Sequence, residues 1–146
     1  MPIYGSISRT NLVIALGEIG DNRAVETLIS LLEFEKVPDI RSFIAEALGK
    51  IGDNRAVEAL IQIANYGELP ETRFAVATSL GEISDNRAVE TLISLLGDDD
   101  LHVRNSAAFA LNNIDDHRAA EALTNFSKQR KRSDIIRRST SNAPEN

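Results

Sequence analysis

Apolar residues recur along the chain with the spacing of helices that bury one face. Within residues 39–51, Ile44, Leu48 and Ile51 fall at i, i+4 and i+7, which lie on one side of an α-helix. Residues 54–66 repeat this spacing with further apolar side chains. Because no segment alternates apolar and polar residues with a period of two, we expect no strands.

A longer recurrence groups these helices into pairs. The sequence Asp-Asn-Arg-Ala-Val-Glu begins at Asp21, Asp53 and Asp85, and a related copy begins at Asp116, so the spacings are 32, 32 and 31 residues. A Leu-x-x-Ile element precedes every copy, and an Arg recurs in register upstream of it. Periods of this length are typical of stacked helix pairs, which bury their apolar faces only against their neighbours. The sequence therefore predicts an all-α, right-handed α-solenoid of about four helix pairs.

Turn-forming residues predict the boundaries within this solenoid. Gly52-Asp53 ends one helix and begins the next, because Gly suits a helix C-terminus and Asp is a favoured N-cap. The predicted repeats cover about residues 8–33, 38–66, 70–97 and 99–128. We expect residues 1–7 to form an N-terminal cap segment, and residues 129–146 to be partly disordered or a decayed capping helix. Ile3, Tyr4 and Ile7, or another subunit, are the candidates to cover the first helix pair.

Charge divides the chain into an acidic body and a basic tail. Residues 1–127 contain ten Lys or Arg and twenty Asp or Glu, whereas residues 128–146 contain six and two. An acidic body repels phosphates, so a nucleic-acid partner is disfavoured, while the tail suits an acidic partner or the protein's own body. Without Cys, a disulfide or a thiolate site is excluded. No signal peptide or apolar run of about 18 residues is visible, so we expect a cytoplasmic protein with no membrane contact.

The repeated pattern resembles a known family. Asp-x-x-x-Arg-x-x-x-Ala-x-x-Leu-x-x-Ile-Gly-Asp-x-Arg-Ala-Val-Glu-x-Leu-Ile is similar to the HEAT-like repeat of the phycobilisome-lyase type, over about residues 7–128. The resemblance implies that the helices with the Arg41-type residue line the concave face, and that the Asp-x-Arg-Ala-Val-Glu helices lie on the convex face. Members of this family include bilin lyase subunits, deoxyhypusine hydroxylases and many scaffolds.

The charged residues that recur with the repeat are best interpreted as structural. Catalytic sites are seldom copied four times, whereas an Asp that caps a helix and an Arg that bonds a carbonyl or a neighbouring carboxylate are useful in every copy. We therefore assign no catalytic residue. The predicted structural ladder comprises Arg9, Asp21, Arg23, Arg41, Asp53, Arg55, Arg73, Asp85, Arg87, Arg104, Asp116 and Arg118.

Metal chemistry has little support in the sequence. His102 and His117 do not precede Glu, unlike the His-Glu pairs through which the hydroxylases of this family bind iron. The acidic run at residues 98–100 lacks the ligand spacing of a calcium loop. We expect no metal and no cofactor.

Positions that the repeat leaves variable predict a binding surface. When Ile44 faces the core, Glu46 and Lys50 fall on the opposite side of the same helix, and the same projection exposes Phe74 and Phe109. Exposed aromatic residues beside polar ones are typical of a binding surface, unless the tail folds over them. The predicted partner-binding residues are Ile14, Glu18, Phe43, Glu46, Lys50, Phe74, Thr78, Glu82, Asn105, Phe109 and Asn113.

These observations favour a protein–protein interaction scaffold or adaptor that binds its partner through the concave face and has no catalysis of its own. The alternative implied by the resemblance is a phycobilin lyase subunit that binds a bilin or its acceptor phycobiliprotein. In that case Phe74 and Phe109 would stack on the bilin, and Glu18, Glu46 or Glu82 would lie near its pyrrole nitrogens. Oligomerisation through the uncovered N-terminal end is a further expectation, and the sequence also fits a trimmed piece of a longer array.

Overall fold

The computed structural model describes residues 2–65 and 68–142, with side chains from residue 8 onward. These residues contain no strand, which confirms the all-helical prediction. In each of the first three helix pairs, a short 3-10 turn precedes the second helix. These turns are η1 (Asn22–Ala24), η2 (Asn54–Ala56) and η3 (Asn86–Ala88). The α-helices are α1 (Pro2–Ile19), α2 (Val25–Phe34), α3 (Pro38–Ile51), α4 (Val57–Asn65), α5 (Pro70–Ile83), α6 (Val89–Leu95), α7 (Leu101–Asn113) and α8 (His117–Ser141).

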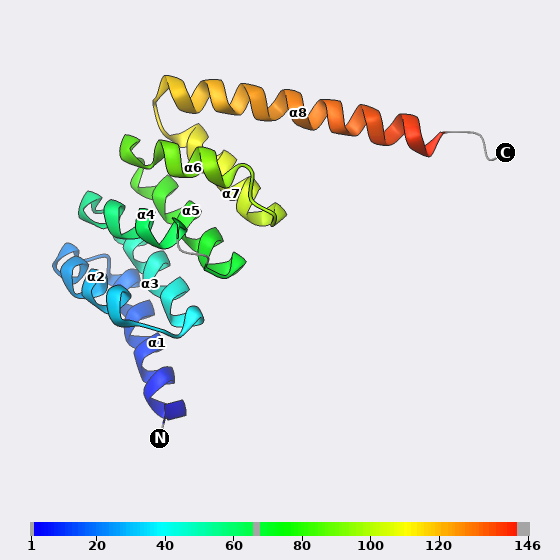
Figure 1. Cartoon of the computed structure of the whole chain (residues 1–146). Coiled ribbons are helices and arrows are strands. Elements are labelled where there is room, and N and C mark those ends of the chain that lie inside the picture. The colour runs from blue at the N-terminus through cyan, green and yellow to red at the C-terminus, as the bar shows by residue number, and fades with distance from the viewer. Residues whose placement is uncertain (1, 66–67, 143–146) are drawn as a thin grey trace.

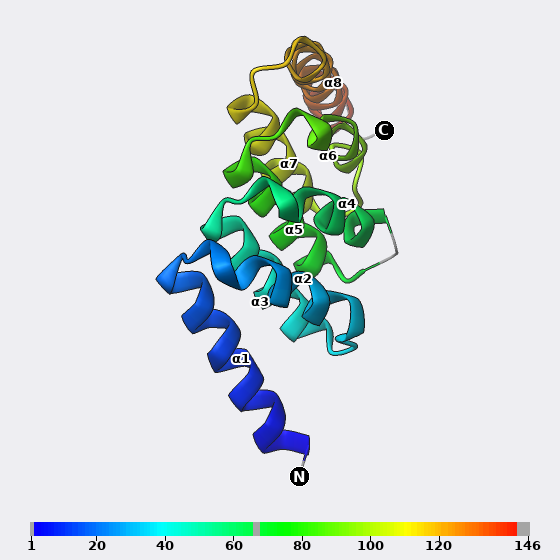
Figure 2. The same cartoon turned by 90° about the vertical axis from the view of Figure 1, so that its left-hand side faces the viewer.

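The helices form the two layers of an α-solenoid, as Figures 1 and 2 show. α1, α3, α5 and α7 pack on one another in chain order and form the inner layer. α2, α4 and α6 form the outer layer, and each packs on the inner helix that follows it, while α8 packs on α6 and α7. Neighbouring outer helices touch at few points, so the stack curves toward the inner layer. We call the surface of α1, α3, α5 and α7 that is turned away from the outer helices the inner face.

The turn inside each helix pair is built by residues that suit its backbone. Gly20 and Gly52 adopt φ angles of 70° and 74°, in the left-handed region where Gly has no steric cost. Ser84 takes the same place in the third pair, with a φ of 56°, and its hydroxyl bonds the carbonyl of Gly81 at 2.7 Å. In the structure one helix therefore ends and the next begins at Gly52-Asp53, as the sequence predicted.

The core lies between the two layers and comes from equivalent positions of successive repeats. Leu48 and Leu80 of the inner helices and Leu60 and Leu92 of the outer helices are fully buried. Ile51, which the helical spacing places with this group, is only partly buried, because it lies at the end of its helix. Interlocking apolar residues along the whole stack join the helix pairs into one body.

The inner helices approach one another at a row of glycines. A Cβ atom built on Gly17 would lie 2.9 Å from the Cα of Ala47, and one on Gly81 would lie 2.9 Å from the Cα of Ala110. Gly49 faces Ser79 in the same way. The equivalent position in the last inner helix is Asn112, which is exposed. No inner helix of the same geometry can therefore pack against α7 as closely as α7 packs against α5.

The helices at the two ends extend beyond the predicted boundaries. α1 begins at Pro2, so residues 2–7 continue the first inner helix and do not form a separate cap segment. The side chains of Ile3, Tyr4 and Ile7 lie outside the described part. α8 runs from His117 to Ser141 without a break at residue 128, so the described part of the tail is helical (Figure 1). Residues 143–146 of the predicted tail lie outside the description. None of the described helices is long and apolar enough to cross a membrane.

Candidate functional site: the inner face

One set of arginines links the outer helices. Asp53 accepts a hydrogen bond from the backbone N–H of Arg55 at 2.9 Å and thereby caps η2. The Arg55 guanidinium bonds the same Asp53 carboxylate, and it also donates to the Glu26 carboxylate at 3.2 Å and the Asn22 carbonyl at 3.0 Å in the preceding repeat. The hydrogen bonds that the Arg55 side chain and backbone donate to Asp53 lower the pKa of Asp53 from 3.8 to about 2. The same contacts recur at Arg87 and at Arg118.

A second set of arginines links each inner helix to the linkers around it. Arg41 donates to the Leu32 carbonyl in the last turn of α2 at 2.8 Å and to the Glu35 carbonyl of the linker before α3 at 2.9 Å. It also pairs with the Glu68 carboxylate of the next linker at 2.6 Å. Such contacts hold the linkers in place, which is a structural task. In the described part, no group of three or more His, Asp or Glu residues is placed to bind a metal ion.

The inner face carries a hollow between the N-terminal halves of α3, α5 and α7. Phe43 and Phe74 are its aromatic residues, and its volume is about 470 Å³. Phe74 is 43% exposed, whereas Phe43 packs partly on the core. We call this hollow the acidic pocket, because four carboxylates and no Lys or Arg line it. Its lining residues are Asp39, Ser42, Phe43, Glu46, Pro70, Glu71, Phe74, Asp100 and His102.

A smaller hollow of about 130 Å³ adjoins the acidic pocket between α1 and α3. Ile14, Gly17 and Lys50 line it, and Phe43 and Glu46 line both hollows. The Lys50 ammonium is occupied, because it donates a hydrogen bond to the Glu18 carboxylate, which raises the pKa of Lys50. The two hollows together form a groove across α1, α3 and α5, and the cation at its end is already paired.

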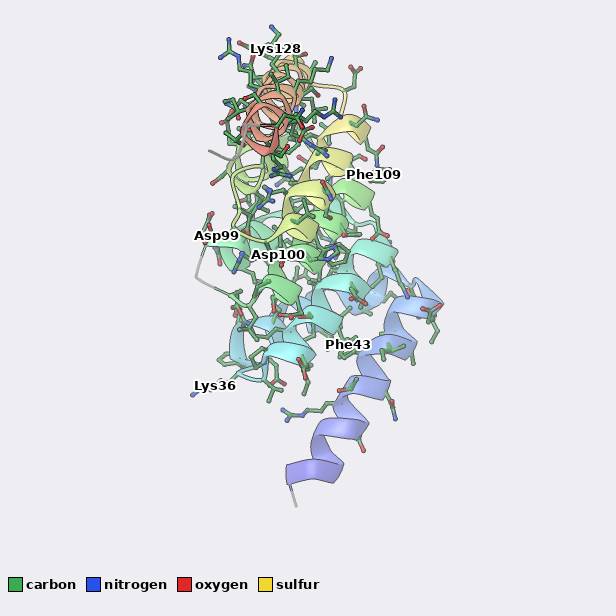
Figure 3. All side chains as sticks on the ribbon, turned by 90° about the vertical axis from the view of Figure 1, so that its right-hand side faces the viewer. Lys36, Phe43, Asp99, Asp100, Phe109 and Lys128 are labelled. Carbon is green, nitrogen blue, oxygen red and sulfur yellow. The ribbon has the colours of Figure 1, made fainter. Side chains whose placement is uncertain are left out.

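The predicted binding residues fall into separate groups in the structure. Ile14, Phe43, Glu46, Lys50 and Phe74 line the groove, and Glu18 lies beside it through its bond to Lys50. Phe109 is on the same side of the body as Phe43, as Figure 3 shows, but it is 70% exposed and lines neither hollow.

The remaining predicted residues do not line the groove either. The Thr78 hydroxyl lies 2.8 Å from the Ser106 hydroxyl, and Asn113 is exposed at the end of α7. Burial raises the pKa of Glu82, whose carboxylate lies against Gly49. Asn105 lines a different pocket, between α7 and α8.

Six lining residues of the acidic pocket are not among the predicted binding residues, namely Asp39, Ser42, Pro70, Glu71, Asp100 and His102. Asp39, Glu71 and His102 occupy equivalent positions in the first turns of α3, α5 and α7. They fall on the same side of the helix as Glu46, so extending the helical projection by one turn identifies them. The helical projection does not identify Asp100, because this residue is the N-cap of α7 and precedes the helix. Its side chain accepts the backbone N–H groups of His102 and Val103, so its sequence position indicates only a capping role.

Comparison with known protein families agrees with this architecture. A family model described as HEAT repeats matches residues 7–69 and again residues 57–142, which together cover most of the chain. The chain belongs to the HEAT-repeat family. HEAT repeats commonly mediate protein–protein interactions, and the match is to HEAT repeats in general. No curated protein matches the sequence.

Proposed function

We propose that this HEAT-repeat protein is an interaction scaffold whose inner-face groove binds a segment of a partner that combines apolar and cationic side chains. The observation that carries the proposal is the composition of the acidic pocket, where Phe43 and Phe74 lie among four carboxylates without a Lys or Arg. An aromatic floor contributes most of the binding energy in such sites, and the surrounding charges select the partner.

The rigidity of the groove supports the same proposal. Every residue that lines it comes from a helix or a helix cap, and these helices are locked by the buried core and the linker arginines. Binding to a preformed surface loses little conformational entropy, so a short partner segment is sufficient.

A fluorescently labelled helical peptide of Leu and Arg, at the spacing of an amphipathic helix, is the direct probe. We expect the full chain to bind it in an anisotropy titration, and Phe74→Ser to weaken binding about tenfold, as expected for an aromatic anchor. Phe109→Ser is the matched control, because Phe109 is exposed on the same side but lines neither hollow, and it should change the affinity less than twofold.

A peptide of opposite charge tests whether the carboxylates select the partner. The same peptide with Glu in place of Arg should not bind the groove, since four carboxylates repel it. Equal affinity of wild type and Phe74→Ser, with helical content unchanged in circular dichroism, would show that the groove is not the binding site.

A phycobilin is a weaker candidate for this groove. The bilin alternative has both Phe74 and Phe109 stack on the pigment, yet of the two only Phe74 lines the acidic pocket. Bilins carry two propionates, and a pocket with four carboxylates and no cation repels anionic groups. Mixing the protein with a bilin tests this alternative, because a red-shifted visible absorption band would favour it and an unchanged spectrum would disfavour it.

A further inference from the structure

Each of the first three inner helices uses its arginine to bind a carboxylate from the linker of the next repeat. Arg9 pairs with Glu35 at 3.0 Å, Arg41 with Glu68 at 2.6 Å, and Arg73 with Asp98 at 2.7 Å. The Arg73–Asp98 contact is forked, with a second bond at 2.9 Å, and the Asp98 side chain is only 7% exposed. The fold therefore contains three copies of a site in which a guanidinium holds an acidic side chain that follows an outer helix.

The last inner helix has the arginine without the carboxylate. Arg104 donates to the Asp98 and Asp99 carbonyls of its own linker at 2.7 and 2.9 Å, as Arg41 does in its repeat. Within the described residues α8 continues past the point where the other outer helices end, so no linker of a next repeat lies beside Arg104 (Figure 1). Arg104 forms no ion pair with a residue of the described part.

Arg104 instead lines a pocket of about 560 Å³ between α7 and α8. Two further arginines, Arg130 and Arg137, come from α8 and line this pocket with Arg104. Arg130 lies 6.0 Å from the ring centre of Phe126, another lining residue, and this cation–π contact orients its guanidinium. Asp134 is the one acidic lining residue. We call this site the arginine pocket.

We propose that the arginine pocket binds an acidic peptide segment of a partner, whose carboxylate takes the place that Glu35, Glu68 and Asp98 fill in the preceding repeats. Guanidinium groups hold carboxylates through paired, planar hydrogen bonds, and three of them select a segment with several acidic residues. The inference does not rest on the inner-face proposal, because the two pockets share no lining residue and select opposite charges.

The chain provides its own probe. A peptide that copies residues 94–100, Ser-Leu-Leu-Gly-Asp-Asp-Asp, contains the carboxylate that Arg73 holds, and the same peptide with three Asn is its neutral control. Titrated into the ¹⁵N-labelled full chain at low ionic strength, the acidic peptide should shift the amide signals of Arg104, Asn105 and Arg130. The neutral peptide should leave them in place.

Two substitutions on α8 separate a specific pocket from general charge attraction. Arg137→Gln removes a lining cation from an exposed position without a role in the fold, and it should weaken binding of the acidic peptide at least threefold. Arg138→Gln removes the same charge from the next residue, which does not line the pocket, and it should change the affinity less than 1.5-fold.

Three results would overturn the proposal. Equal weakening by Arg137→Gln and Arg138→Gln would show that the peptide senses only the net charge of α8. Shifts confined to other parts of the body would place the peptide elsewhere. Inorganic phosphate is titrated in a separate arm, and tighter binding of phosphate than of the peptide would make this a phosphate site instead of a peptide site.

Discussion

Three glycines set the distance between the inner helices, and the effect of adding one methyl group to them follows from their contacts. At Gly81, a Cβ atom would lie 2.7 Å from the Cβ and 2.9 Å from the Cα of Ala110, so the backbone of α7 must move. We expect Gly81→Ala to lower the free energy of unfolding by about 2 kcal/mol, because an overpacking cost of about 3 kcal/mol exceeds the gain of about 1 kcal/mol in helix propensity.

Urea unfolding of the variant measures this loss, and Gly97→Ala is its control. A Cβ atom on Gly97 would lie 3.6 Å from the Ser94 carbonyl oxygen, which is an ordinary contact, so the free energy of unfolding should change by less than about 0.5 kcal/mol. If both variants were as stable as the wild type, the close approach of α5 and α7 would not be needed for the stack.

At the scale of elements, the aspartates that cap the outer helices make the free energy of unfolding depend on pH. The pKa values of Asp21, Asp53 and Asp116 are lowered to about 2 by hydrogen bonds from Arg23, Arg55 and Arg118. A carboxylate with a lowered pKa in the folded state stabilises the fold above its unfolded pKa, near 4, and this contribution is lost as the pH falls toward 2. The free energy of unfolding should therefore decrease over this range.

Asp53→Asn isolates the charge, since Asn keeps an oxygen that can cap η2. The variant should be less stable than the wild type at pH 7, and the two should converge as the pH approaches 2, in urea unfolding followed by circular dichroism. Asp115→Asn is the control, because Asp115 is exposed and its side chain bonds none of the described residues. A constant difference between wild type and Asp53→Asn across this pH range would contradict the account.

The elements show how far sequence patterns reach in this protein. The recurrence of Gly52-Asp53 and its equivalents placed the helix pairs and their turns correctly, because capping residues act locally. The tail was predicted to be partly disordered or a decayed capping helix, and the structure extends α8 through it to Ser141. Residues 128–141 contain no Gly or Pro that would end a helix, so the local signal for continuation was present.

The candidate site was predictable only in part, for a geometric reason. A helical projection shows which side of one helix is exposed, and it selected Phe43 and Phe74 for this reason. It does not show how neighbouring helices are offset, so it could not separate Phe74, which lines the acidic pocket, from Phe109, which does not. Asn105 is equivalent to Phe74 in the repeat, yet it lines the arginine pocket, because α8 is long enough to pass beside it.

At the scale of the whole molecule, α8 has a first part that packs on the repeats and a distal part that is exposed. Its first turns pack on α6 and α7 and complete the last repeat, with Ala119 fully buried. Every residue from Ser127 to Asn142 is exposed, and the basic distal half of α8 extends past the repeat body in Figure 1. A chain that stops after Lys131 should therefore lose helical signal in circular dichroism while its free energy of unfolding changes by less than about 0.5 kcal/mol. A fall of more than about 1 kcal/mol would instead show that the distal half of α8 helps to hold the repeats together.

This shortened chain should bind the Leu-Arg peptide as the wild type does, because the inner face is unchanged. It should lose most of its affinity for the acidic peptide, because Arg137 is removed.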